Sequence, residues 1–297
     1  MESQPLHLSF SKAECYSRCP RQYYYRYVMK LEPVIESANL AFGSAIDGAT
    51  GEFLRGVAQG ASIDPEPIFS RLWQGHTRLD FTNKKLNHAD LMSIGRNLTS
   101  RFPMTWEQSG LHVATLPDGE PGVQVTLSVT LGDDIVYNSK IDLLAFDTDG
   151  RLGISDIKTA GSTTPAEFEL VSTQLTDYQM QVEANWERLG IQPGDVEWLN
   201  FIELRKTKGA PVAVLPMSPR RSDEVIQERI EEIRTIAENI RAERFPRHSG
   251  IAFASPCALC EFRAACTRQD YSGLQRRNST PTLAGLSNLE FDFEEAA

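Results

Sequence analysis

Residues 153–159, Gly-Ile-Ser-Asp-Ile-Lys-Thr, place an acid and a lysine two positions apart inside an apolar run. Such a run is typical of a β-strand, in which residues two apart point to the same face of the sheet. Asp156 and Lys158 therefore share a face. That face is not ordinary core, because a buried carboxylate or ammonium is costly unless it is paired or bound to a metal.

The residues before this stretch predict the rest of a small antiparallel sheet. Apolar side chains alternate from Val123 to Leu131, which indicates a half-buried strand. Turns at 132–134 (Gly-Asp-Asp) and 147–150 (Asp-Thr-Asp-Gly) lead first into a strand beginning at 135 and then into the strand that carries Asp156. This meander makes Asp142 a neighbour of Asp156.

Two carboxylates that converge at a strand edge make an oxygen site suited to Mg²⁺ or Mn²⁺. A lysine beside them can orient water and offset charge on a phosphate. Asp142, Asp156 and Lys158 therefore point to metal-assisted phosphodiester hydrolysis. An Asp-x-Lys pattern alone is common by chance, and a surface ion pair on an edge strand is the alternative interpretation.

The remaining sequence completes an α/β pattern. Residues 50–118 and 165–190 look mostly helical, 222–244 carry an apolar helical face, and 196–204 form a nearly continuous apolar strand. The 297 residues, 41% of them hydrophobic, suffice for one large domain or two small ones. No apolar run approaches the ~18 residues of a membrane span, and the first residues lack a secretory pattern. We therefore expect a cytoplasmic protein without a membrane partner.

Several motifs together resemble the PD-(D/E)XK nuclease superfamily, and within it the RecB-like branch. Asp142 falls where the second-motif aspartate belongs, and residues 156–159, Asp-Ile-Lys-Thr, are similar to the (D/E)-x-K motif with its frequent following threonine. Residues 174–178, Gln-Leu-Thr-Asp-Tyr, resemble the Gln-x-x-x-Tyr motif of the next helix. Residues 9–33 resemble the branch's opening segment of Ser-x-Ser, Cys-Pro and an aromatic-basic run. The resemblance covers about residues 8–270.

This resemblance implies a restriction-endonuclease-like core, with a mixed central sheet and antiparallel meander flanked by helices. It implies a single nuclease domain at 1–275 with a helical insertion at about 50–118. The polar composition after Cys266, low in aliphatic residues, predicts a flexible acidic tail at 276–297. The resemblance also implies roles for the motif residues. Lys158 would position the attacking water, Gln174 and Tyr178 would orient Lys158 or the DNA, and the metal would bind Asp47, Asp142, Asp156 and the carbonyl of Ile157.

The first motif departs from the branch. A histidine usually follows the glycine there, whereas this chain has Asp47 after Gly43. Asp47 could bind the metal through a more ionic contact, or it could mark a weakened site, or Glu52 could be the true ligand in another register. The helix motif also has rival registers through Gln179 and Gln181.

Three thiols crowd into residues 257–266, Cys-Ala-Leu-Cys-Glu-Phe-Arg-Ala-Ala-Cys. In a reducing compartment such spacing indicates metal or cluster binding rather than disulfides. The pattern resembles that of the CRISPR adaptation exonucleases and the AddB helicase-nuclease subunit, which implies a 4Fe–4S cluster held by Cys19, Cys257, Cys260 and Cys266. Zn²⁺ is the alternative metal, and Cys15 is the substitute for Cys19. The cluster would staple segments 15–30 and 255–270 across a very long loop.

The formal charge of −10 leaves nucleic-acid binding to local basic patches. Arg21, Tyr24 and Arg26 could stack bases and contact phosphates, or could pack around the cluster. We expect a Mg²⁺- or Mn²⁺-dependent deoxyribonuclease, most simply an exonuclease on single strands or DNA ends in repair, recombination or CRISPR adaptation. The alternatives are a non-catalytic DNA-binding or assembly module, and a nuclease active only with a helicase, recombinase or integrase that docks on the acidic tip.

Overall fold

The computed structural model describes residues 5–81, 86–132, 134–248, 250 and 255–277. Its elements follow one another along the chain as follows: β1 (Leu6–Ser9), α1 (Phe10–Arg18), α2 (Pro20–Tyr23), the π-helix η1 (Tyr24–Val28), β2 (Leu31–Pro33), β3 (Glu36–Ser37), α3 (Ala38–Ala58), α4 (Pro65–Gln74), β4 (Leu79–Asp80), α5 (His88–Ser109), β5 (His112–Val113), β6 (Val123–Thr130), β7 (Ile135–Phe146), β8 (Leu152–Ala160), α6 (Phe168–Val171), α7 (Thr173–Ala184), α8 (Trp186–Leu189), β9 (Val196–Arg205), β10 (Val212–Val214), β11 (Ser218–Pro219), α9 (Asp223–Arg241), the 3₁₀-helix η3 (Pro256–Leu259), α10 (Arg263–Arg268) and β12 (Leu274–Arg276).

The main sheet is mixed, with the strand order β1-β7-β8-β9-β10. Strands β6, β7 and β8 form the predicted antiparallel meander, and β9 joins β8 in parallel. Strand β7 also pairs with β1 in parallel and with β5 antiparallel. Close packing of β8 on β9 requires Gly153, because a Cβ atom there would lie 2.0 Å from the ring of Trp198.

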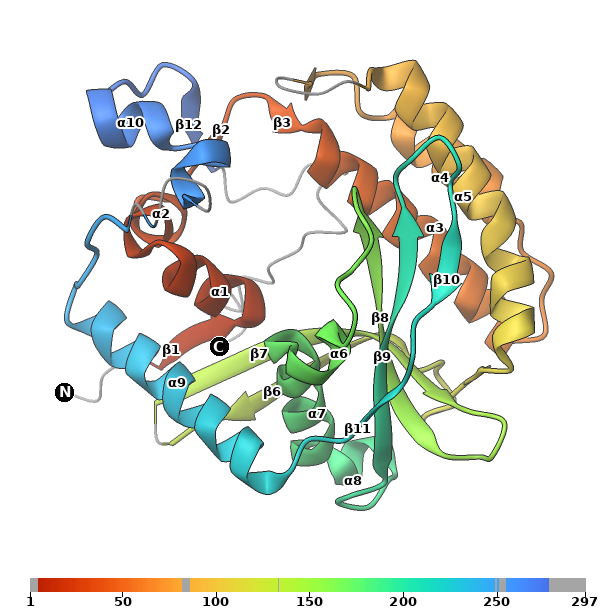
Figure 1. Cartoon of the computed structure of the whole chain (residues 1–297). Coiled ribbons are helices and arrows are strands. Elements are labelled where there is room, and N and C mark those ends of the chain that lie inside the picture. Colours follow the sequence, from red (N-terminus) through yellow and green to blue (C-terminus); the bar gives the residue numbers. More distant parts are fainter. Residues whose placement is uncertain (1–4, 82–85, 133, 249, 251–254, 278–297) are drawn as a thin grey trace.

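Helices cover both faces of this sheet (Figure 1). Helices α3, α4 and α5 pack on one face around Phe42, Phe69 and Trp73, and α7 packs on the other face through Leu175 and Val182. Helix α9 lies against α7 and α1. The mixed sheet between two helical layers confirms the predicted restriction-endonuclease-like α/β fold.

Partway along β6 and β7, the apolar side chains switch from one face of the sheet to the other. Val123 and its partner Leu143 pack toward α3, whereas Val125 and its partner Ile141 pack toward α7. Residues two apart normally share a face. Here Gln124, between the two valines, has a left-handed φ of 55°, and this rotates the strand. The change-over lies opposite Asp142.

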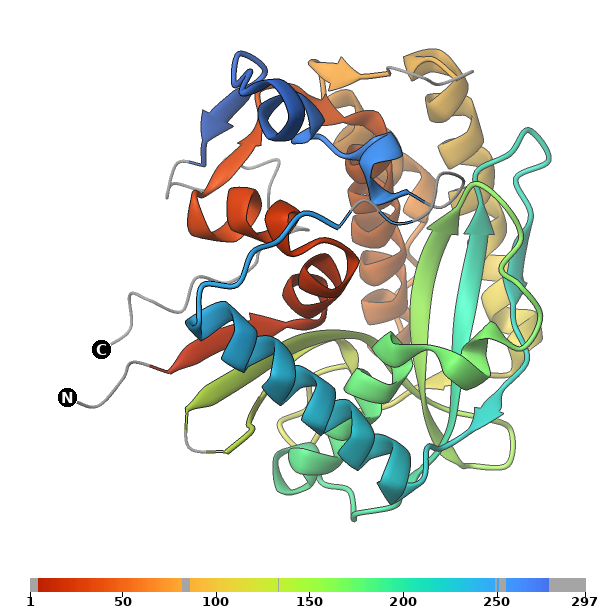
Figure 2. The same cartoon turned by 60° about the vertical axis from the view of Figure 1, so that its left-hand side comes forward.

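The C-terminal segment of the described chain contacts the segment that contains α2, η1 and β2. Strand β12 pairs antiparallel with β2, and Glu261 accepts hydrogen bonds from Gln22 and Arg26. Figure 2 shows α10 and β12, in blue, beside the red and orange segments of α2 and β2. The predicted approach of segments 15–30 and 255–270 is therefore present in the fold.

Several predicted boundaries need correction. The helix that carries Asp47 begins at Ala38, so it already includes the turn before Gly43. The region 50–118 contains the end of α3, then α4 and α5 with β4 between them, and it then contributes β5 to the sheet. The helix expected over 165–190 is broken into α6, α7 and α8 by caps at Ser172 and Asn185. The predicted tail at 276–297 starts inside the structured part, because Arg276 belongs to β12; the tail beyond Arg277 lies outside the described residues. None of the described helices is both long and apolar enough to cross a membrane.

Helix α7 is fixed to α9 by a buried ion pair. Arg229 Nε lies 2.6 Å from Asp177 Oδ1 and its Nη2 lies 3.0 Å from Oδ2, and Tyr137 donates a hydrogen bond to the same carboxylate. Asp177 and Tyr137 have no exposed surface. Removing one partner of a buried pair leaves the other charge without compensation.

We predict that Arg229→Ala lowers the free energy of unfolding by about 3–5 kcal/mol, measured by urea denaturation. Arg234→Ala on the same helix is the control, because its partner Glu231 is exposed and such pairs contribute about 0–1 kcal/mol. Equal losses in the two variants would contradict a special role for the Arg229 pair.

Candidate active site

Strands β7 and β8 bring two carboxylates and a lysine together. Asp156 on β8 has no exposed surface, and Lys158 Nζ lies 3.0 Å from its Oδ1 and 2.8 Å from its Oδ2. Asp142 on β7 is half-buried and its Oδ2 accepts a hydrogen bond of 2.9 Å from the Ile157 N–H. The main chain of β8 thus holds Asp142 next to the Asp156–Lys158 pair.

The electrostatics of this group reflect crowded negative charge. Burial raises the pKa of Asp142 well above its ordinary value, and the carboxylates of Asp156 and Asp47 raise it further. Burial alone would lower the pKa of Lys158, but the attraction of Asp156 and Asp142 outweighs it and the pKa rises. Lys158 is therefore a cation at neutral pH, and it offsets part of the negative charge of Asp156 and Asp142.

Helix α7 adds Gln174 and Tyr178 to the site. The Ser172 hydroxyl caps the helix, and Gln174 Nε2 donates a 3.0 Å hydrogen bond to the Tyr178 hydroxyl one turn later. Burial raises the pKa of Tyr178 well above its usual value, and the nearby Asp142 and Asp156 raise it further. Tyr178 is therefore a neutral donor close to both acids.

The rival helix registers have other partners. Gln179 exchanges hydrogen bonds with the main chain of Arg221, at 3.1 Å and 2.7 Å. Gln181 donates to the main-chain carbonyl of Tyr137. Both glutamines are buried, and these contacts tie α7 to its neighbours. The geometry thus favours the register through Gln174 and Tyr178.

Helix α3 contributes Asp47. Its Oδ2 accepts a 2.8 Å hydrogen bond from Gln124 Nε2 and lies 3.6 Å from Lys140 Nζ. Glu52, the alternative ligand from the sequence, is largely exposed and pairs with Arg55 at 3.3 Å. Sequence reasoning missed Gln124 and Lys140. The position of Lys140, two residues before Asp142 on one strand, was an available signal, whereas Gln124 looked like the solvent-facing member of an alternating strand.

The donor set is compatible with a hard divalent cation. Magnesium is commonly held by one or two carboxylates plus waters, and Asp142 and Asp156 supply such a pair, with the carbonyl of Ile157 next to Asp156 in sequence. Their mutual repulsion is the kind of strain that a cation relieves. Within the described residues, no three or more His, Cys, Asp or Glu side chains stand ready as a metal-binding group, so protein side chains alone do not complete a metal shell.

The cysteines gather without forming a ligand set. Burial raises the pKa of Cys260 to about 11, and nearby Cys19 and Cys257 contribute to the rise. Cys266 packs with Cys260 against the cluster of Tyr25, Leu31, Phe262 and Ala265. Among the described residues, no three of these thiols form a group that could hold a metal ion, so the geometry does not support the predicted iron–sulfur cluster. Cys15 is buried, and burial raises its pKa to about 12.

The predicted DNA-binding residues lie beside these cysteines. Arg26 pairs with Glu261 and sits 5.8 Å above the ring of Phe262. Arg21 lies 5.5 Å above the ring of Tyr24. These contacts match the packing role that the sequence left open as the alternative to DNA binding. DNA contact by the three residues stays a prediction.

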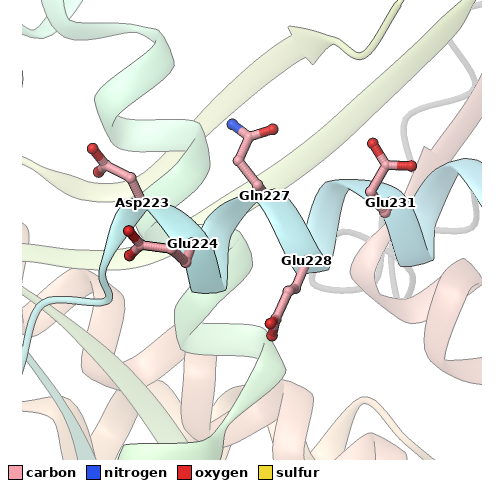
Figure 3. A pocket seen from close by; sticks show the side chains of 5 residues that line it. All are labelled: Asp223, Glu224, Gln227, Glu228 and Glu231. Atoms are coloured by element: carbon pink, nitrogen blue, oxygen red, sulfur yellow. The ribbon is translucent and has the colours of Figure 1, made fainter.

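Acidic charge collects elsewhere, along the outer face of α9. A hollow there is lined by Asp223, Glu224, Gln227, Glu228 and Glu231, whose side chains project from the helix in Figure 3. The helix carries six acidic and three basic residues. This face repels a polyanion, and much of the chain's negative charge therefore lies outside the candidate site.

Comparison with known proteins agrees with this geometry. The sequence model of the PD-(D/E)XK nuclease superfamily matches residues 7–267. The chain belongs to this superfamily. A crystal structure of a protein from Eubacterium rectale, provisionally named an exonuclease, shares 13% identity and has a TM-score of 0.51, covering 94% of this chain and 91% of its own. That likeness supports the superfamily fold alone.

A second solved structure, LHK-Exo in complex with dAMP, shares 14% identity and covers 69% of this chain and 94% of its own. Its TM-score of 0.27 is too low to carry an argument. No curated protein matches the chain at a significant level. Membership of the superfamily supports a nuclease, and the identity of the substrate is a separate question.

We predict that Asp142→Asn raises the melting temperature of the protein in EDTA by a few degrees. The substitution removes one negative charge beside Asp156, and the asparagine oxygen can still accept from Ile157. The same variant should lose the rise in melting temperature that added Mn²⁺ gives the wild type. Thermal scans with EDTA and with Mn²⁺ measure both effects.

Asp147→Asn is the control for this prediction. Burial opposes the charge of Asp147, but hydrogen bonds from the main chain and side chain of Arg151 outweigh burial and lower the pKa of Asp147. This carboxylate is stabilising, so its loss should lower the melting temperature and leave the response to Mn²⁺ unchanged. A destabilised Asp142→Asn variant with an intact Mn²⁺ response would contradict the proposed repulsion.

Proposed function

We propose that this chain is a Mg²⁺- or Mn²⁺-dependent deoxyribonuclease that hydrolyses phosphodiester bonds. The observation that carries the proposal is the approach of Asp142, Asp156 and Lys158 where the pairing of β7 and β8 ends, with Tyr178 from α7 beside them. Membership of the PD-(D/E)XK superfamily supports the same reaction class. An exonuclease acting on single strands or DNA ends is the form of activity that we favour.

Each residue has a role in this proposal. Asp142, Asp156 and the Ile157 carbonyl would hold the cation, and Asp47 would approach it from α3. A bound divalent cation would supply charge stabilisation at the phosphate and a more acidic water. Lys158, held as a cation by its carboxylates, would orient the attacking water and attract the phosphate. Tyr178, kept neutral and steadied by Gln174, would donate a hydrogen bond toward Asp156 or the DNA backbone.

Charge distribution supports an approach of DNA away from α9. The acidic hollow on α9 disfavours a polyanion. Tyr24 packs against the same small apolar cluster as Cys260 and Cys266, and Arg21 lies over its ring, so neither residue belongs to this hollow. We propose these residues, with lower support for Arg26 because of its pairing with Glu261, as contacts for the DNA that leads to the site.

We predict that Lys158→Ala reduces the rate of DNA cleavage by about 10²–10³-fold. The site then loses the cation that pairs with Asp156, while the carboxylates remain. DNA binding should change much less. The assay uses single-stranded and duplex DNA labelled at either end, with Mn²⁺, Mg²⁺ or EDTA, on anaerobically purified protein. Position of the labelled products distinguishes exonuclease from endonuclease action and gives the polarity.

Lys208→Ala is the matched control, because Lys208 is exposed in the turn between β9 and β10 and should leave the rate of cleavage intact. A wild-type protein that binds DNA but cuts nothing with either metal would overturn the proposed activity of the isolated chain. The non-catalytic module, or a nuclease that needs a helicase, recombinase or integrase, would then replace it.

We also propose that Cys19, Cys257, Cys260 and Cys266 bind a 4Fe–4S cluster, or Zn²⁺ as the alternative. The support is their spacing and the electrostatic proximity of Cys19, Cys257 and Cys260. The cluster would reinforce the contact between β2 and β12, and no catalytic step depends on it.

Cys260→Ser should lose at least half of the iron, or of the zinc, in anaerobically purified protein, whereas Cys15→Ser should keep it. Metal analysis and visible absorption measure the loss and distinguish iron–sulfur from zinc. Metal-free wild-type protein with normal folding would contradict this proposal and leave the nuclease proposal untouched.

A further inference from the structure

Gln124 stands in an unusual position directly across from Asp142. In the ladder between β6 and β7, Val123 pairs with Leu143 and Val125 pairs with Ile141, so Gln124 and Asp142 lie opposite each other between these pairs. Gln124 adopts a left-handed φ of 55°, which glycine adopts readily and other residues do not. Such backbone conformations persist where the surrounding structure requires them, often at functional sites.

The strained backbone directs the Gln124 side chain toward helix α3 and Asp47. Its Nε2 donates a 2.8 Å hydrogen bond to Asp47 Oδ2, and its Oε1 accepts a 2.6 Å hydrogen bond from Arg55 Nη2. Arg55 in turn pairs with Glu52. These contacts fix which end of the amide faces which partner: the carbonyl faces the guanidinium and the amino group faces the carboxylate.

Helix α3 leaves room for this amide at Gly51. A Cβ atom at Gly51 would lie 3.0 Å from Gln124 Nε2 and 3.1 Å from its Cδ. Those distances are shorter than ordinary contact, so a methyl group at 51 would force the amide to shift by a few tenths of an ångström. Two separate features, a left-handed residue on β6 and a glycine on α3, thus serve the same hydrogen bond.

The carboxylate that receives this bond belongs to the charged group of the site. Asp47 raises the pKa of Asp142 and also acts on Lys158. Both Gln124 and Lys140 contact Oδ2 of Asp47, so two donors from β6 and β7 hold the same oxygen of this carboxylate. Without these donors, Asp47 would be free to rotate away from the like charges of Asp142 and Asp156.

We propose that Gln124 is a positioning residue that holds Asp47 against the repulsion of Asp142 and thereby sets the affinity of the site for its divalent cation. The inference rests on the proposed metal-dependent function and deepens it. Gln124 touches neither metal nor substrate in this account. It acts through Asp47, as the hydrogen-bond partners of metal-binding carboxylates commonly do.

The test measures Mn²⁺ binding to the full chain by calorimetry without DNA, alongside the melting temperature in EDTA. Gln124→Gly should weaken Mn²⁺ binding by roughly 10-fold or more. Its melting temperature should stay the same or rise, because glycine is suited to φ of 55°. Unchanged Mn²⁺ affinity in Gln124→Gly would overturn the proposal, whatever the melting temperature does.

A double-mutant cycle covers the case in which Gln124→Gly loses both affinity and stability. Gly51→Ala alone should weaken Mn²⁺ binding, because its methyl group displaces the Gln124 amide. In the Gln124→Gly background the same substitution should leave the affinity unchanged, because the amide is gone. Equal effects of Gly51→Ala in both backgrounds would overturn the proposal.

The same experiment separates this inference from the proposed function. Wild-type protein that binds Mn²⁺, and loses it on Asp142→Asn, supports the metal site independently of Gln124. If the wild type binds no Mn²⁺, the proposed metal site fails and the role of Gln124 fails with it. If Asp142→Asn loses Mn²⁺ but the Gln124 variants bind Mn²⁺ as tightly as the wild type, the role of Gln124 fails and the metal site stands.

Discussion

Repulsion between carboxylates held close together where strands β7 and β8 separate is the constraint on which the rest of the site depends. Asp156 is fully buried, Asp142 is held beside it by the Ile157 N–H, and Asp47 acts on Asp142 from α3. Lys158 offsets part of this charge but not all of it. Such a group is destabilising for an empty protein and favourable for one that binds a cation, which is the usual compromise between stability and activity.

The framework around the site is correspondingly rigid. Helix α7 carries Tyr178 and Gln174 on the side of the acids, while its next-door residue Asp177 is fixed to Arg229 on the far side. Ser155, next to Asp156 in β8, donates a 2.6 Å hydrogen bond to Asn200 of β9. The charged groups cannot relax apart without breaking buried contacts on neighbouring elements, so the fold keeps like charges in place.

The sequence was sufficient for the features that depend on local pattern. The Asp-Thr-Asp-Gly turn at 147–150 fixes the pairing of two strands, and the alternation around Asp156 and Lys158 fixes their face, so the proximity of Asp142 followed from short-range rules. The four-residue spacing of Gln174 and Tyr178 likewise matched one turn of a helix. Motif resemblance supplied the superfamily, which the family comparison bears out.

Contacts between distant segments could not be predicted in the same way. The pairing of Arg26 with Glu261 joins residues far apart in sequence, and nothing local distinguishes it from a solvent-facing arginine. The left-handed conformation of Gln124 breaks the alternation that its own neighbours suggest. The side of the site formed by Asp47, Gln124 and Lys140 therefore appears only in three dimensions, where α3 meets β6 and β7.

The most direct test of the account is the position of a bound cation. Crystals of the wild-type protein grown with Mn²⁺ would be measured by anomalous diffraction at the manganese edge. The account predicts a peak between the carboxylates of Asp142 and Asp156, next to the carbonyl of Ile157. Two results would contradict it: a peak confined to the acidic face of α9, at Asp223 or Glu224, or no peak between Asp142 and Asp156 at saturating Mn²⁺.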